Sequence, residues 1–126
     1  MRRLFASAAA VAVCLVAAGA GSAQRACTIT GTPGPDVLFG TARNDVICGL
    51  GGNDQIFGMS GNDVLIGGPG ADYLEGGPGS DTYFGGTGND TIRSYDATRD
   101  IVDGGPGIDD AWTDHFDVVR HVEHLG

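Results

Sequence analysis

The chain of 126 residues contains no lysine, one tryptophan and three cysteines, and beyond residue 23 it has no long apolar run. Seven arginines stand against 16 aspartates and glutamates, so the formal net charge is −9. Without a basic patch, the chain is a poor partner for nucleic acid or an anionic membrane surface. No nucleophilic side chain stands beside a recognisable base, and we therefore expect no catalytic residues and no enzyme.

The first 23 residues differ from the rest and predict a signal peptide. Arg2 and Arg3 precede an apolar run at 4–18, and the small residues Gly21 and Ala23 suit a cleavage site after residue 23. The run is shorter than the roughly 20 residues of a spanning helix. We therefore expect a secreted, extracellular protein that is not inserted in the membrane after cleavage. Both the general secretory and the twin-arginine export routes stay open.

Of the three cysteines, Cys14 lies in the predicted leader, whereas Cys27 and Cys48 remain in the mature chain. An even pair in an oxidising compartment usually forms a disulfide, and we expect one here.

Glycine is abundant, with 23 residues, and it follows a nine-residue period. Residues 31–93 divide into GTPGPDVLF, GTARNDVIC, GLGGNDQIF, GMSGNDVLI, GGPGADYLE, GGPGSDTYF and GGTGNDTIR. Every unit begins with Gly and has Asp at its sixth place, and the eighth residue is always apolar: Leu38, Ile47, Ile56, Leu65, Leu74, Tyr83 and Ile92. After Arg93 the phase slips by one, so that Asp100 comes one place late, and GGPGIDDAW restores the pattern with Asp109.

Six residues of turn chemistry followed by a three-residue strand make half a coil in each unit. Two units then form one circuit of a flattened, all-β solenoid, and residues eighteen apart stack about 4.8 Å from each other. The eighth residue of each unit points into the core. One buried aliphatic residue per unit contributes about 1.5–3 kcal/mol, which cannot offset an ordering cost of about 1–2 kcal/mol for every residue.

Stacking also aligns the aspartates in two rows, one with Asp36, Asp54, Asp72 and Asp90 and the other with Asp45, Asp63 and Asp81. Carboxylates about 5 Å apart repel each other, so the stack needs a cation between successive turns. Carboxylate and backbone carbonyl oxygens suit Ca²⁺ better than Mg²⁺ or Zn²⁺. The gaps between regular turns predict five sites, and the irregular units could add two.

The pattern G-G-x-G-x-D-x-U-x over residues 31–112 resembles the RTX, or hemolysin-type, calcium-binding repeat. The resemblance implies a parallel β-roll, a right-handed β-solenoid, with Ca²⁺ as its cofactor. It also implies that the metal is held by aspartates and glycines of the turns: Asp36, Asp45, Asp54, Asp63, Asp72, Asp81, Asp90, Asp109, Gly49, Gly52, Gly58, Gly61, Gly67, Gly70, Gly76, Gly79, Gly85 and Gly88. Arg43 stands where a glycine is expected, so the first two units could serve as a cap rather than as strong calcium turns.

The two ends depart from the repeat, and we expect them to cap the roll, residues 24–30 at the N-terminus and residues 113–126 at the C-terminus. A strand at 28–30 would stack on 46–48, which puts Cys27 on the order of 10 Å from Cys48, beyond disulfide reach. A bridge therefore requires the chain before Thr28 to fold back.

Two alternative functions stay open. Outward aromatic residues of the strands, Phe39, Phe57, Tyr73 and Phe84, could form the binding face of a calcium-dependent adhesion or scaffold module. His115, His121 and His124 in the tail could serve a small accessory hydrolase, although their spacing matches no zinc signature. The sequence indicates neither an extracellular partner nor an oligomeric state.

Overall fold

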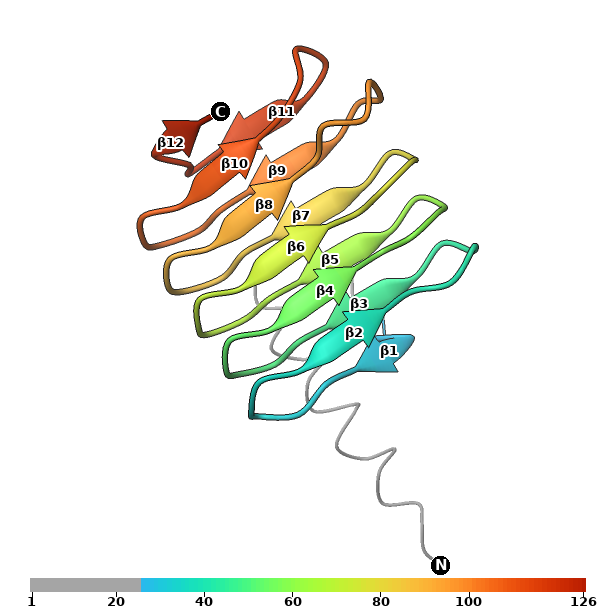
Figure 1. The fold of residues 1–126 in the computed structure, drawn as a ribbon, viewed down its shortest axis with the longest axis vertical. Coiled ribbons are helices and arrows are strands. Elements are labelled where there is room, and N and C mark those ends of the chain that lie inside the picture. The colour runs from blue at the N-terminus through green and yellow to red at the C-terminus, as the bar shows by residue number, and fades with distance from the viewer. Residues whose placement is uncertain (1–25) are drawn as a thin grey trace, which may run out of the picture.

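The computed structural model describes residues 26–126 as a flattened coil in which short strands alternate with turns (Figure 1). The predicted signal peptide lies outside the described residues. The part of the chain from residue 26 onward contains no helix long and apolar enough to cross a membrane.

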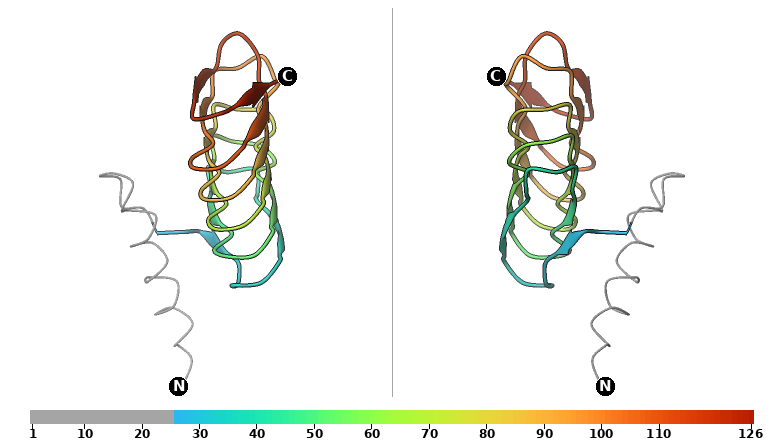
Figure 2. Two further views of the ribbon diagram at one scale, coloured as in Figure 1. Left: turned by 90° about the vertical axis from the view of Figure 1, so that its left-hand side faces the viewer. Right: turned by 90° about the vertical axis from the view of Figure 1, so that its right-hand side faces the viewer.

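The strands form two parallel sheets that face each other across a narrow core (Figure 2). One sheet has the order β1-β3-β5-β7-β9-β11 and the other β12-β10-β8-β6-β4-β2. The strands are β1 (Ile29–Thr30), β2 (Val37–Phe39), β3 (Val46–Cys48), β4 (Gln55–Phe57), β5 (Val64–Ile66), β6 (Tyr73–Glu75), β7 (Thr82–Phe84), β8 (Thr91–Arg93), β9 (Ile101–Asp103), β10 (Asp110–Trp112), β11 (Val118–Arg120) and β12 (His124–Leu125). This is the predicted all-β, parallel β-roll.

The register follows the nine-residue period. Val46 pairs with Val64 and Tyr73 with Thr91, in each case eighteen residues apart. The additional residue in the turn after β8 lengthens the spacing to nineteen on both sheets, as in the pair Thr82 and Ile101. The slip is therefore absorbed within one turn, and the strands beyond it keep their pairing.

The core consists of the eighth residue of each unit, as predicted. Ile47, Ile56, Leu65, Leu74, Tyr83 and Ile92 are fully buried, and Val102 and Ala111 continue the column beyond the irregular turn. Leu38, at the N-terminal end of its sheet, is only partly buried, because no further coil covers it.

Tyr83 is the one aromatic member of this column, and its hydroxyl has a structural role. In most turns the first glycine donates its N–H directly to the last strand residue of the next coil, as Gly67 does to Phe84 at 2.9 Å. At Gly76 the Tyr83 hydroxyl comes between, accepting from the Gly76 N–H at 3.0 Å and donating to the Arg93 carbonyl at 3.1 Å. Both buried polar groups are satisfied through the side chain.

A disulfide joins Cys27 to Cys48, with a Cα–Cα distance of 6.0 Å. The register expected for this end is present, since Ile29 pairs with Ile47. The expected separation of about 10 Å was wrong, because it assumed that the chain stays extended before Thr28. The backbone bends at Thr28, which brings Cys27 over the last residue of β3.

Residues 113–126 add one strand to the end of each sheet. β11 pairs with β9 at a spacing of seventeen residues, and β12 pairs with β10 at a spacing of fourteen. β11 begins directly after Asp117 and continues its sheet beyond the repeat.

The outward aromatic residues do not share one face. Phe39 stacks on Phe57, with ring centroids 5.2 Å apart, and Phe57 contacts Tyr73 at 5.8 Å, all on the sheet that contains β2, β4 and β6. Phe84 belongs to β7 in the opposite sheet. The expectation of a common face was wrong for Phe84, because successive units alternate between the two sheets.

Candidate functional site

The aspartate before each strand links successive coils. One carboxylate oxygen, Oδ1, accepts the backbone N–H of the aspartate one coil earlier, at 2.7–3.0 Å throughout both rows. The first row runs from Asp36 through Asp54, Asp72 and Asp90 to Asp109, and the second runs from Asp45 through Asp63, Asp81 and Asp100 to Asp117. We call these two chains of hydrogen bonds the carboxylate ladders.

The second oxygen of these carboxylates has a different environment. It is buried and has no hydrogen-bond partner within the described chain in seven residues: Asp54, Asp63, Asp72, Asp81, Asp90, Asp100 and Asp109. A buried carboxylate oxygen without a donor or a cation is strongly unfavourable. Its recurrence at the same place in seven turns indicates a shared ligand rather than a local defect.

Six of these oxygens, all except that of Asp100, lie beside the glycine that begins their turn, in the space between two coils that we call a recess. A Cβ built on Gly67 would lie 2.5 Å from Oδ2 of Asp72 and 2.6 Å from the carbonyl oxygen of Gly85. The corresponding position at Gly58 would lie 2.6 Å from Oδ2 of Asp63 and 2.7 Å from the Gly76 carbonyl. The recess is therefore lined by acceptors and has no room for a side chain, which suits a cation.

The predicted glycines fall into two groups. Those at the first place of a unit border the recess, namely Gly49, Gly58, Gly67, Gly76 and Gly85. Those at the fourth place lie against backbone of the preceding coil, namely Gly52, Gly61, Gly70, Gly79 and Gly88. Gly70 has a φ of 132°, which only glycine adopts without strain.

The first two units differ from the others in a way that the sequence did not reveal. Oδ2 of Asp36 accepts from the Thr32 N–H at 2.6 Å and from its hydroxyl at 2.9 Å. Oδ2 of Asp45 accepts in the same way from Thr41, at 2.7 and 2.8 Å. Threonine at the second place of these units provides the donors that the later coils lack, so these two carboxylates are satisfied within the chain.

Burial changes the acid–base properties of the ladders. Desolvation, with a further contribution from neighbouring carboxylates, raises the pKa of Asp72 and of Asp100 to about 7. Desolvation likewise raises the pKa of Asp81 and of Asp90 to about 6. The charged form is therefore disfavoured in the chain alone, and a bound cation would reverse this preference.

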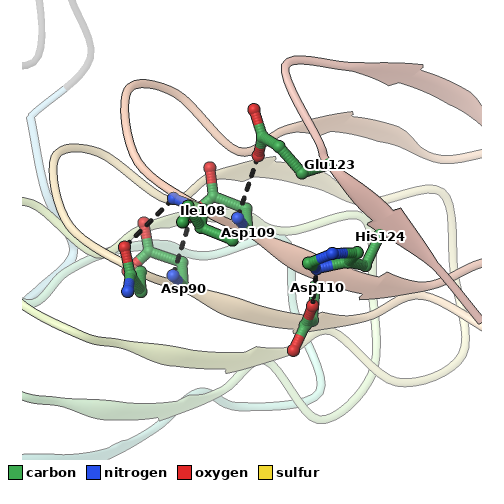
Figure 3. Close-up of polar contacts among 7 residues, drawn as sticks. Asp90, Ile108, Asp109, Asp110, Glu123 and His124 are labelled. Atoms are coloured by element: carbon green, nitrogen blue, oxygen red, sulfur yellow. Dashed lines mark hydrogen bonds and ion pairs between the residues drawn. The ribbon is translucent and has the colours of Figure 1, made fainter.

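The C-terminal end of the first ladder uses a glutamate (Figure 3). Asp90 donates its N–H to Oδ1 of Asp109 at 2.8 Å, and Asp109 donates its N–H to Oε2 of Glu123 at 2.9 Å. Asp117 ends the second ladder. Neither residue was predicted. For Asp117 the signal was its place directly before a strand, whereas Glu123 comes from a fourteen-residue coil that has no counterpart in the repeat.

Asparagine at the fifth place forms a further set of bonds between coils, which we did not predict. The side-chain oxygen of Asn53 accepts the N–H of Ala71 at 2.9 Å, and that of Asn62 accepts from Ser80 at 3.0 Å. These bonds go to the following coil, whereas the aspartates accept from the preceding one. Each turn is therefore tied in both directions.

The tail histidines do not converge on a site. His121 contacts Oδ1 of Asp103 and His124 contacts Oδ1 of Asp110, each at 2.8 Å. His115 packs its ring against Phe116. Among residues 26–126, the one group of three or more metal-ligating side chains near each other consists of Asp81, Asp96 and Asp100.

Taken together, the recesses offer carboxylate and backbone carbonyl oxygens in a repeating, buried and anionic setting. Hard oxygen donors in this number and with this flexibility suit Ca²⁺. The donors described above would hold the ion between successive coils, and the ion would supply the positive charge that the ladders lack. The fold and the recesses together define a calcium-binding repeat protein.

The sequence matches the model of one known protein family. The model for the RTX calcium-binding nonapeptide repeat, which spans four copies, matches residues 30–65 and again residues 57–92. The matched region covers half of the chain, and the protein belongs to this family. Repeats of this kind bind calcium and are typically structural rather than enzymatic. A search of curated proteins gives no match.

Proposed function

We propose that this is a secreted calcium-binding protein whose mature chain folds when Ca²⁺ binds. The observation that carries the proposal is the set of seven buried carboxylate oxygens, which have no donor and repeat at the same place in successive coils. The chain alone leaves these groups uncompensated, whereas a divalent cation in each recess would neutralise them.

The thin core supports the coupling between binding and folding. A single column of residues is fully buried between the sheets, and the outward residues of the strands are mostly half-buried or exposed. Apolar burial of this extent does not order a glycine-rich chain by itself. Several sites that stack on each other also make the transition cooperative, because each ion fixes the two coils that it joins.

Secretion is supported by the leader-like pattern of residues 1–23 and by the disulfide between Cys27 and Cys48. Disulfides persist in oxidising compartments outside the cytosol. Calcium sites of extracellular modules often have dissociation constants of about 10⁻⁴ to 10⁻³ M, so the fold would respond to the external supply of the ion.

The direct test is a calcium titration of the oxidised mature chain, followed by far-ultraviolet circular dichroism and isothermal calorimetry. We expect little β-sheet signal in chelator, a cooperative gain with calcium and a heat of uptake for several ions per chain. Magnesium at the same concentration serves as the control. A chain that is fully β-structured in chelator would disprove the coupling, and the absence of any heat would disprove calcium binding.

A calcium-dependent adhesion module is the second candidate, and the stacked aromatic residues favour it. Phe39 is 58% exposed and continues through Phe57 to Tyr73 along one sheet. Replacing Phe39 and Phe57 by Ser should leave calcium uptake unchanged but abolish retention of the protein on the surface of the producing cells. Phe84→Ser, on the opposite sheet, is the matched control, and equal retention of all variants would argue against adhesion.

A further inference from the structure

The turn between β8 and β9 is the one turn in the repeat region that has seven residues instead of six, from Ser94 to Asp100. Its additional length brings a carboxylate to a place where the other turns have none. Asp96 and Asp100 both face the preceding coil on this edge of the roll, where Asp81 stands. The three side chains each place an oxygen within 4.8 Å of the others.

Two of these carboxylates each have one oxygen without a hydrogen-bond partner in the described chain. Asp81 and Asp100 are exposed by 1% or less, and Oδ2 of each accepts no hydrogen bond from the described residues. Their other oxygens belong to the second carboxylate ladder, where Oδ1 of Asp100 accepts the Asp81 N–H at 2.8 Å. Two buried acceptor oxygens therefore remain for a ligand that can neutralise them.

Asp96 is held in place by the backbone of both coils. Its Oδ1 accepts from the Thr98 N–H at 2.9 Å, and its Oδ2 accepts from the Gly79 N–H at 3.2 Å. The Thr98 hydroxyl lies 2.6 Å from Oδ1 of Asp96 and also 2.6 Å from the Gly79 carbonyl oxygen. A carboxylate has about four acceptor positions, so these bonds leave capacity for a cation.

The surroundings of Asp81 also differ from those in the regular recesses. Where Asp72 has the carbonyl of the next coil beside the glycine of its unit, the space at Gly76 is bordered by Oδ2 of Asp81 and by the Tyr83 hydroxyl. The Tyr83 hydroxyl therefore borders this space, and Asp96 provides a charged oxygen from the longer turn. Asp96 also lines a surface hollow with Glu75, Arg93 and Tyr95.

We propose that Asp96 adds a third carboxylate to the stacked pair Asp81 and Asp100, so that the three form a calcium site at the longer turn with one ligand that the nonapeptide pattern does not supply. This proposal rests on the proposed function, since it concerns one site among those of a calcium-binding roll. Three carboxylates give this site one negative charge more than a pair of stacked turns provides. Affinity for Ca²⁺ rises with the number of charged ligands, so this site fills first.

The test compares the wild-type mature chain with Asp96→Asn, Asp96→Ser and Asp110→Asn by calcium calorimetry and by native mass spectrometry with calcium. Asp110→Asn removes the same charge from a half-exposed side chain that contacts His124, and it controls for net charge. Serine at residue 96 keeps a short acceptor for the turn. We expect both changes at residue 96 to weaken the tightest binding step by roughly tenfold or more.

An unchanged ion count and isotherm in both Asp96 variants would overturn the proposal, even if their thermal stability falls. Equal losses in Asp110→Asn would also overturn it, because the effect would then be one of overall charge. Crystals of the wild-type protein grown with calcium give a test that does not depend on the variants. Density for an ion among the three carboxylates is expected, and its absence there with ions in the regular recesses would refute the site. No uptake of calcium by the wild-type chain would instead refute the proposed function itself.

Discussion

The aspartate at the sixth place of each unit serves two purposes through its two oxygens. Oδ1 joins one coil to the preceding one, as Asp72 does when it accepts the Asp54 N–H at 2.8 Å. From Asp54 onward, Oδ2 has no hydrogen-bond donor within the described chain. The glycine that begins the unit keeps this recess open, because any side chain at that place would occupy it. Both residue types are therefore needed together, one for the charge and the other for the space.

Replacing Gly67 by Ala should fill one recess. The new Cβ would lie 2.5 Å from Oδ2 of Asp72 and 2.6 Å from the Gly85 carbonyl, where the ion is expected. We expect the loss of one calcium ion per chain in native mass spectrometry and a lower calcium-saturated stability in urea. Gly34→Ala is the control, since its nearest neighbour, the Thr32 hydroxyl oxygen, is 3.9 Å away. Equal ion counts for the two variants would show that the recess at Gly67 does not hold the metal.

Replacing Tyr83 by Phe should leave the Gly76 N–H and the Arg93 carbonyl without their shared partner. An unsatisfied buried polar group costs about 1–3 kcal/mol, so the free energy of unfolding in saturating calcium should fall by about that amount. Tyr73→Phe removes a half-buried hydroxyl that donates to Glu75, and it should cost less. Similar losses for both variants in urea unfolding would contradict a special role of the Tyr83 hydroxyl.

At the level of elements, the units share the same turn and strand but differ in which groups contact the second oxygen of the aspartate. The first two turns provide their own donors through Thr32 and Thr41, and the first strand is fixed by the disulfide to Cys48. The central turns lack such donors, and a bound ion would neutralise their carboxylates. We therefore expect the N-terminal coil to depend least on calcium and to offer a template on which the next coil can stack.

Removing the disulfide should loosen this first coil. Cys27 and Cys48 are 21 residues apart, and a loop of this length corresponds to about 3 kcal/mol in the chain-entropy account. A Cys27→Ser/Cys48→Ala variant in saturating calcium should lose hydrogen-exchange protection in β1 and β3 but keep it in β7. Chemical reduction of the wild-type chain should give the same pattern. An even loss of protection along the whole roll would instead show that the bridge stabilises all coils alike.

At the level of the whole molecule, the roll gathers its negative charge in two parallel rows. Burial raises the pKa of Asp72 and of Asp100 to about 7 and that of Asp81 and of Asp90 to about 6. In an unfolded chain these groups titrate near their ordinary value of about 3.9. Between these values the folded chain without calcium binds more protons than the unfolded chain, so its stability rises as the pH falls and is lost as the pH rises through about 6 to 7.

We therefore expect the chain in chelator to gain β-sheet circular dichroism when the pH is lowered from about 7.5 to about 5. Over the same range, calcium affinity should fall, because protons compete with the ion for the carboxylates. Since His121 and His124 also contact carboxylates, a variant with both replaced by Gln separates their contribution. A loss of β-structure on acidification in chelator would show that the ladders do not govern the response to pH.

Much of this architecture could be predicted from the sequence because the repeat is regular. A constant period of nine residues fixes which side chains stack, since strands in a parallel sheet lie at a constant separation. The core column from Ile47 to Ile92, the two rows of aspartates and the pairing of the first strand with β3 all follow from this period alone. The one-residue slip was visible as well, because it displaced Asp100 and left the later units in phase.

The tertiary structure decided the features that depend on the orientation of side chains and on local bends of the backbone, which the nine-residue period does not specify. Only the fold shows that one oxygen of each carboxylate is engaged and the other is free, and that Thr32 and Thr41 satisfy theirs. A bend before β1 brought the cysteines within bonding distance, and the alternation of sheets separated Phe84 from the other aromatic residues. Asp96, Asp117 and Glu123 lie in coils of irregular length, where no period predicts a partner. The sequence by itself determined which residues stack. The folded backbone determined which of their atoms form hydrogen bonds, because a hydrogen bond requires a narrow range of donor–acceptor distance and angle.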